Sequence, residues 1–152
     1  LNNAAPAATL EKAKDFELTG LDGKTYKLSA LKGKVVLINF WATWCKYCVK
    51  ENPSLDRLYT TFKNDGLVVL GISVDRSPLT VETFLQKKPV TYPVLMDLDG
   101  KVFVKTYTVI GLPTTFLINK DGYIVEKLIG EQHFDSNKFK QKISALLQKS
   151  EG

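Results

Sequence analysis

The two cysteines of this 152-residue chain, Cys45 and Cys48, stand between an apolar run and a stretch with helical spacing. The run covers residues 35–41, and such runs are typical of strands buried on both faces. Residues three apart on a helix have Cβ atoms about 5–6 Å apart, near the roughly 3.5–4.5 Å that a disulfide needs. The spacing therefore predicts a thiol pair, at a junction of strand and helix, that closes and opens with little backbone movement.

Other segments predict how the sheet is built. Apolar runs at residues 67–74 and 115–118 predict two further buried strands. Residues 14–18 and 25–28 are expected to form an opening hairpin, and a late hairpin is expected to add antiparallel strands. Three Asp-Gly pairs predict tight turns: residues 22–23, 99–100 and 121–122.

Helical spacing recurs between the predicted strands. Ser77 and Pro78 resemble an N-cap and a first-turn proline, and we expect Leu79, Phe84 and Leu85 of this helix to face inward. Apolar residues at helical spacing indicate two further helices, within residues 55–62 and 139–147. The order predicts an α/β fold with a mixed central sheet flanked by helices on both faces.

Size and composition indicate one domain, expected over residues 10–152. A mass of 17.0 kDa with 44% hydrophobic residues suits a single core. The net charge of +5 comes from lysines spread along the chain, which indicates solvated faces and no nucleic-acid partner. Residues 1–9 look like a flexible leader, either the remainder after removal of a signal peptide or anchor, or the start of a chain designed to begin there.

Three motifs resemble one known family. Residues 39–48 are similar to the active-site segment of thioredoxin-like proteins, and Pro53 stands where that family has a helix-kinking proline. Residues 111–118 resemble the family's cis-proline loop and the strand after it. Residues 71–75 and the helix that follows are similar to the TlpA/ResA branch of extracytoplasmic reductases.

The resemblance implies a thioredoxin-like fold with an N-terminal hairpin and one extra strand–helix insertion. It also implies a bacterial thiol:disulfide oxidoreductase in the periplasm or at the outer face of the cytoplasmic membrane, reducing protein disulfides such as those of apocytochrome c. An upstream membrane thiol reductant would recharge it. We expect a monomer that needs no cofactor or metal and contacts a membrane only through an N-terminal anchor.

Two positions depart from the family pattern. Asn39 stands where cytoplasmic thioredoxins have a buried aspartate, and an amide cannot carry a proton usefully. Lys46 and Tyr47 stand between the cysteines, in place of the family's usual dipeptide, which contains a proline. The redox potential and the choice of partner therefore cannot be transferred from relatives.

Cys45 is predicted to be the nucleophile, because unpaired amides at an exposed helix start stabilise a thiolate. Cys48, one turn further in, is predicted to be the resolving thiol. One alternative is a static structural disulfide, although a bond closing so short a loop stabilises little. Another is a zinc site, for which two cysteines and one histidine supply too few ligands.

Glu51 lies three residues after Cys48, so both fall near one helical face. A carboxylate there would raise the thiol pKa and could carry the exchange proton. A glutamate matches this position in the TlpA/ResA branch. The alternative is a first-turn glutamate that complements the helix dipole.

The family resemblance also implies a cis bond between Leu112 and Pro113, with Leu112 pairing its backbone with an extended substrate segment. The alternative is a trans loop proline. We expect the substrate contacts to comprise Trp44, Lys46, Tyr47, Leu112 and Pro113, and Trp41 to pack internally.

Three other functions share features with this sequence. An oxidant that inserts disulfides would use the same cysteines. A peroxiredoxin shares the fold, but its PxxxTxxC motif wants proline and threonine where Ile38 and Ala42 stand. A non-catalytic module that binds copper or a haem apoprotein belongs to a different class.

Overall fold

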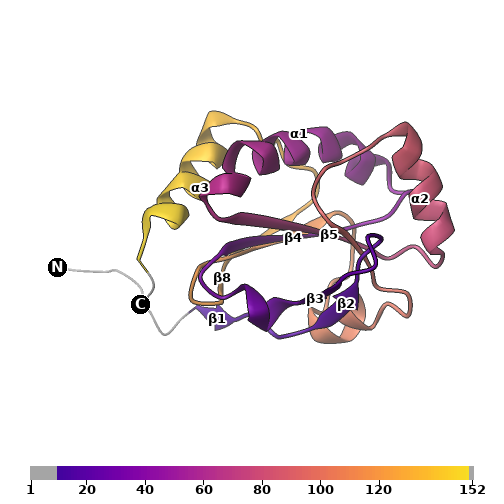
Figure 1. The fold of residues 1–152 in the computed structure, drawn as a ribbon, viewed down its shortest axis with the longest axis horizontal. Helices are drawn as coiled ribbons and strands as arrows, with labels where there is room; N and C mark the ends of the chain where they lie inside the picture. Colours follow the sequence, from indigo (N-terminus) through magenta and orange to yellow (C-terminus); the bar gives the residue numbers. More distant parts are fainter. Residues whose placement is uncertain (1–9, 151–152) are drawn as a thin grey trace.

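Six strands form the central sheet in the spatial order β1-β8-β7-β4-β5-β6. The computed structural model describes residues 10–150 (Figure 1). The strands are β1 (Glu11–Lys12), β4 (Val35–Trp41), β5 (Leu67–Ser73), β6 (Val94–Met96), β7 (Thr114–Ile118) and β8 (Tyr123–Ile129). Strands β4, β5 and β6 pair in parallel, whereas β7 pairs antiparallel to both β4 and β8. The predicted mixed sheet and its late antiparallel hairpin are confirmed.

Strand β4 is buried along its whole length, and its side chains alternate between two cores. Val36, Ile38 and Phe40 belong to one apolar cluster, while Leu37 and Trp41 belong to the other. Because successive residues of a strand point to opposite faces, Asn39 lies on the face of Leu37 and Trp41. A polar side chain is thus placed inside an apolar layer.

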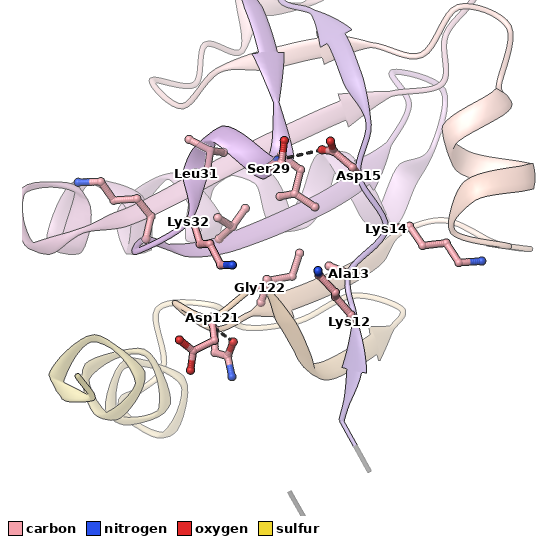
Figure 2. A pocket seen from close by; sticks show the side chains of 14 residues that line it. Lys12, Ala13, Lys14, Asp15, Ser29, Leu31, Lys32, Asp121 and Gly122 are labelled. Carbon is pink, nitrogen blue, oxygen red and sulfur yellow. Dashed lines mark hydrogen bonds between the residues drawn. The ribbon is translucent and has the colours of Figure 1, made fainter. Parts of the chain in front are cut away.

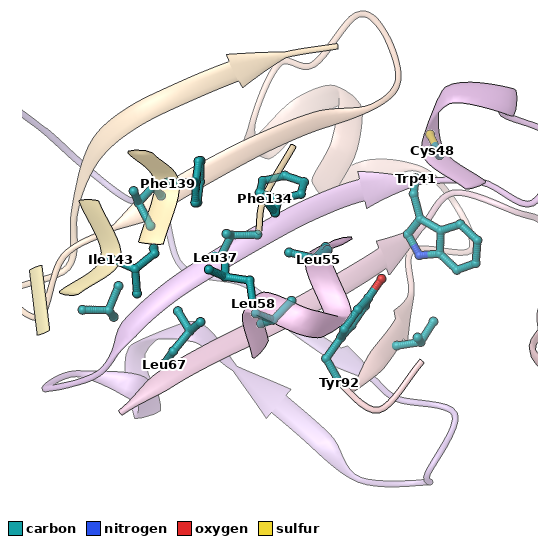
Figure 3. Packing of buried hydrophobic residues seen from close by; sticks show 14 of the residues in the cluster. Leu37, Trp41, Cys48, Leu55, Leu58, Leu67, Tyr92, Phe134, Phe139 and Ile143 are labelled. Atoms are coloured by element: carbon teal, nitrogen blue, oxygen red, sulfur yellow. The ribbon is translucent and has the colours of Figure 1, made fainter. Parts of the chain in front are cut away.

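Three helices cover the face of Leu37: α1 (Lys46–Phe62), α2 (Pro78–Lys87) and α3 (Asn137–Gln148). Figure 3 shows Leu55 and Leu58 of α1 packed near Leu37, with Phe139 and Ile143 of α3 beside them. The helices present these apolar stripes because their hydrophobic residues recur at helical spacing. Helix α1 continues through Pro53.

The opposite face is covered by short elements. They are the hairpin of β2 (Glu17–Thr19) and β3 (Thr25–Lys27), the 3-10 turn η2 (Leu28–Leu31) and the π-helical turn η4 (Val102–Thr106). A further 3-10 turn, η3 (Lys63–Asp65), follows α1. Aromatic rings fill this core: the Tyr107 ring centroid lies 5.9 Å from that of Phe40 and 5.0 Å from that of Phe116.

One predicted orientation is wrong. Leu79 is 68% exposed, and Val81 is instead the fully buried residue of α2, with Phe84 and Leu85 half-buried against the core. Because α2 packs on the core through Val81, Leu79, two positions earlier and about 200° around the helix, points to solvent. Ser77 is the N-cap of α2, and its side chain makes no capping hydrogen bond. The predicted leader, residues 1–9, lies outside the described residues. Within residues 10–150, every helix is too short or too polar to cross a bilayer.

Candidate active site

The cysteine pair lies at the junction between the end of β4 and the start of α1. β4 ends at Trp41, α1 begins at Lys46, and Cys45 is the N-cap residue with extended backbone angles. Cys45 and Cys48 form a disulfide with their Cα atoms 5.3 Å apart. The predicted bridge between neighbouring positions of one helix turn is confirmed.

The two sulfurs differ in environment. Cys45 is 8% exposed and Cys48 is fully buried, so the first cysteine is less open than expected, but the predicted order of exposure holds. The Cys48 backbone N–H donates to Cys45 Sγ at 3.3 Å. A thiolate at Cys45 would therefore gain this hydrogen bond together with the favourable end of the α1 dipole.

Asp75 anchors the turn that carries the cysteines. Its carboxylate accepts hydrogen bonds from Thr43 N at 3.0 Å, Thr43 Oγ1 at 2.7 Å and Ser73 Oγ at 2.7 Å. Thr43 stands two residues before Cys45, while Ser73 ends the parallel strand next to β4. Because charge-assisted hydrogen bonds are the stronger kind, Asp75 fixes the position of the turn relative to the sheet.

Glu51 is buried one helix turn beyond Cys48, with 1% of its surface exposed. Its Oε1 accepts from Asn39 Nδ2 at 2.7 Å, and its Oε2 accepts from the backbone N–H of Gln132 at 2.9 Å. Burial raises the pKa of Glu51 to about 7, although both of these hydrogen bonds favour the charged form and oppose the rise. The carboxyl group is thus poised to gain or lose a proton near neutral pH.

Asn39 joins Glu51 to the sheet. Its Nδ2 also donates to Thr115 Oγ1 of β7 at 3.0 Å, so both amide hydrogens have acceptors. Its Oδ1 is buried and has no hydrogen-bond partner among the described residues. The amide that replaces the aspartate of cytoplasmic thioredoxins therefore acts as a donor to Glu51.

The Leu112–Pro113 peptide bond is cis, as the family resemblance implied. Thr114 pairs with Phe40 near the end of β4. The loop before β7 therefore lies at the same end of the sheet as the turn that carries the cysteines. The Pro113 carbonyl accepts from Gly130 N at 2.9 Å, and Thr114 Oγ1 donates to Gly111 O at 2.8 Å. Pro113 is buried and Leu112 half-buried.

Exposed side chains accompany the buried sulfurs. Trp44 is 71% exposed and Tyr47 is 55% exposed, and Lys46 between the cysteines is exposed as well. Trp41, in contrast, is buried with its ring centroid 5.6 Å from that of Phe84, as expected. The predicted site residues thus come from the start of α1 and from the loop before β7.

Sequence reasoning missed Asp75, Gln132 and Thr115. The position of Asp75 could have been predicted, because Asp75 lies two residues beyond a strand parallel to β4. The carboxyl ends of neighbouring parallel strands lie at the same end of a sheet. Gln132 acts through its backbone and carries no such signal. Within residues 10–150, no three His, Cys, Asp or Glu side chains come together as metal ligands.

Comparisons with known proteins agree with this geometry. A family model described as the AhpC/TSA family matches residues 9–127. A thiol-disulfide oxidoreductase ResA of Bacillus cereus is 41% identical over 139 residues, covering 91% of this chain and 76% of the relative.

Solved structures show the same fold. A thiol:disulfide interchange protein of the thioredoxin family from Chlorobium tepidum TLS superposes with a TM-score of 0.76 at 27% identity, covering 96% of this chain and 99% of the other. StoA from Bacillus subtilis superposes with a TM-score of 0.72 at 26% identity, covering 84% and 95%. The chain belongs to the AhpC/TSA family of thioredoxin-like proteins and, within it, to the ResA thiol-disulfide oxidoreductases.

Proposed function

We propose that this protein reduces protein disulfides outside the cytoplasm, with Cys45 as nucleophile and Cys48 as resolving thiol. The observation that carries the proposal is the position of Cys45 at the N-cap of α1, where Cys48 N–H donates to its sulfur. Cys45 is also the more exposed of the pair. An attacking thiolate needs both stabilisation and access.

The exchange proceeds in two displacements. The Cys45 thiolate attacks one sulfur of the substrate disulfide, forming a mixed disulfide and releasing the first substrate thiolate. The Cys48 thiolate then attacks the Cys45 sulfur, closing the Cys45–Cys48 bond and releasing the second. The substrate gains two electrons and two protons, and an upstream membrane thiol reductant later restores the dithiol.

Glu51 is proposed to carry the exchange proton. A group transfers protons best when its pKa lies near the working pH, and burial raises the pKa of Glu51 to about 7. Its place one turn after Cys48 on the same helix supports this role. Asn39 and the Gln132 N–H orient the carboxylate and act as positioning groups.

The substrate is proposed to lie along the cis-proline loop. Leu112 would pair its backbone with an extended, cysteine-bearing segment beside Pro113. Trp44, Lys46 and Tyr47 would contact the substrate from the start of α1, which their exposure permits. Apocytochrome c is the proposed substrate, by analogy with the TlpA/ResA branch.

By the same analogy, the protein is proposed to work in the periplasm or at the outer face of a bacterial cytoplasmic membrane. Residues 10–152 are proposed to form one domain that works as a monomer. The single sheet that spans β1 to β8 supports one domain, since its strands come from both ends of the chain.

Reduction of insulin disulfides in the presence of dithiothreitol tests the activity. We expect the wild type to accelerate precipitation of the insulin B chain and the Cys45→Ser/Cys48→Ser variant to give the rate of dithiothreitol alone. Equal rates for the two proteins would favour a non-catalytic binding module. A faster rate for the wild type than for the variant supports the enzyme.

The redox potential separates a reductant from an oxidant. Lys46 lies on an exposed, flexible stem and is largely screened, whereas the buried Glu51 disfavours a nearby thiolate. We therefore expect a potential below about −220 mV in equilibration against dithiothreitol buffers at pH 7. A value above about −180 mV would identify an oxidant that inserts disulfides.

A further inference from the structure

A cavity of about 550 Å³ lies at the end of the molecule opposite the cysteines. Val36, at the beginning of β4, lines it, while Cys45 follows the far end of the same strand. At about 3.3 Å per strand residue, the five steps from Val36 to Trp41 already span roughly 17 Å. The cavity is therefore separate from the redox site, and its size falls in the range of small-molecule pockets.

Three chain segments that are distant in sequence build its walls and are tied to one another. Ala13 N donates to Gly122 O at 2.9 Å, joining the segment after β1 to the β7–β8 turn. Ser29 N donates to Asp15 Oδ1 at 2.8 Å, joining that segment to η2. Gly33 N donates to Lys120 O at 2.9 Å. The cavity is consequently formed before any ligand arrives.

The floor is apolar and the rim is basic. Leu28, Val36 and Ile118 form part of the lining and are buried members of the core. The charged lining residues are four lysines and two aspartates: Lys12, Lys14, Lys32, Lys34, Asp15 and Asp121. The lysines outnumber the aspartates, and Asp15 already accepts hydrogen bonds from Ser29 N and Phe16 N. The rim therefore favours an anion.

Two of these lysines face each other. Figure 2 shows Lys12 and Lys32 on opposite sides of the cavity with their ammonium groups toward it, whereas Lys14 points away. An anionic group between Lys12 and Lys32 would meet both charges, and an apolar body attached to it would reach the floor.

We propose that this cavity binds a small amphipathic anion, a carboxylate or phosphate on a short apolar body. The charged group lies between Lys12 and Lys32, and the apolar body lies against Leu28, Val36 and Ile118. Such a ligand comes either free in solution or as a membrane lipid that enters the cavity with part of its apolar chain. This binding activity is additional to thiol–disulfide exchange.

Titration with octanoate, followed by amide NMR shifts of the full chain, tests the proposal. We expect saturable shifts at the amides of Ala13, Ser29 and Gly122. Lys12→Gln/Lys32→Gln should weaken binding by about fivefold, since each exposed ion pair contributes modestly. The matched control Lys138→Gln/Lys149→Gln removes the same charge from exposed positions of and after α3 and should leave the affinity unchanged.

Two further probes define the ligand. Inorganic phosphate, which lacks an apolar body, should bind more weakly than octanoate. Phosphatidylglycerol vesicles that compete with octanoate identify a membrane lipid as the source, and vesicles without effect identify a soluble amphiphile. Linear, unsaturable shifts, or equal losses in both double variants, would overturn the proposal. Insulin reduction should be the same in all three proteins, because the cavity lies away from the cysteines.

Discussion

At the scale of single residues, the two cysteines are distinguished by what surrounds each sulfur. Cys45 accepts a backbone hydrogen bond and keeps a small exposed surface, while Cys48 is enclosed by the core. Glu51 adds a carboxyl group that can change its charge near neutral pH. The three environments differ, which is why we propose a different task for each side chain.

Cys48→Ser should trap mixed disulfides with substrate proteins, because Cys45 can still attack but nothing resolves the bond. Cys45→Ser should trap almost none, since its remaining thiol is fully buried. Non-reducing gels after incubation with an oxidised substrate measure both. Equal trapping by the two variants would contradict the assignment of Cys45 as the nucleophile and Cys48 as the resolving thiol.

Glu51→Gln should lower the pKa values of the coupled cysteine pair by roughly one unit, because it removes a negative charge from a buried position. It should also slow exchange by removing the proton carrier. Thiolate absorbance titrations and stopped-flow kinetics measure the two effects. Glu131→Gln, which removes a charge near Glu51 without touching its hydrogen bonds, is the control. Superimposable titrations of the wild type and Glu51→Gln would mean that the charge of Glu51 does not affect the cysteines.

At the scale of elements, the active site depends on how β4, α1 and β5 are joined. The register of β4 and β5 places the carboxyl ends of both strands at the same end of the sheet, where Asp75 accepts hydrogen bonds from Thr43. The antiparallel pairing of β4 with β7 brings Thr115 to Asn39 and places the cis-proline loop at this same end. The sheet thus assembles a site from segments more than 70 residues apart.

Asp75→Ala should loosen the turn before Cys45 and slow exchange several-fold, with a loss of about 2–4 kcal/mol in the free energy of unfolding, because hydrogen bonds to a charged group are lost. Hydrogen exchange at the Thr43 amide and insulin reduction measure the two effects. Asp56→Ala is a matched control, because Asp56 accepts the same pair of bonds from Thr91 N and Oγ1. An equal loss of activity in both variants would assign Asp75 a purely structural role.

At the scale of the whole molecule, one buried carboxyl group links the redox site to folding. The pKa of Glu51 is about 7 in the folded chain, against an ordinary value of 4.5. Between these values the folded protein binds more protons than the unfolded chain. The free energy of unfolding therefore falls as the pH rises through this window.

Glu51→Gln should abolish this component of the pH dependence. Urea unfolding at pH 4.5 and pH 7.5 should show the stability of the wild type falling, relative to the variant, by on the order of 2–3 kcal/mol. The comparison cancels the contributions of other carboxylates. Parallel stability curves for the two proteins would mean that Glu51 is ionised throughout, contrary to its burial.

Local patterns determined much of the fold and the centre of the site. The apolar runs specified β4, β5 and β7, because strands buried on both faces need apolar side chains at nearly every position. The spacing of Cys45 and Cys48 specified the disulfide, and the three-residue step from Cys48 to Glu51 placed these two on one side of α1, because residues three apart are neighbours on a helix. Leu79 shows the limit: its side chain points to solvent because α2 packs through Val81 instead.

Only the tertiary structure decided what surrounds these residues. Glu51 meets Asn39 and the Gln132 amide, which lie 12 and 81 residues away in the sequence, and Asp75 meets Thr43 across 32 residues. The lysine-rimmed cavity likewise joins three separate segments. Such contacts depend on strand register and on the packing of helices over the sheet, so no local spacing encodes them. The amino-acid sequence thus determined the cysteine chemistry, and the fold decided the pKa of Glu51, because burial is a property of the assembled core.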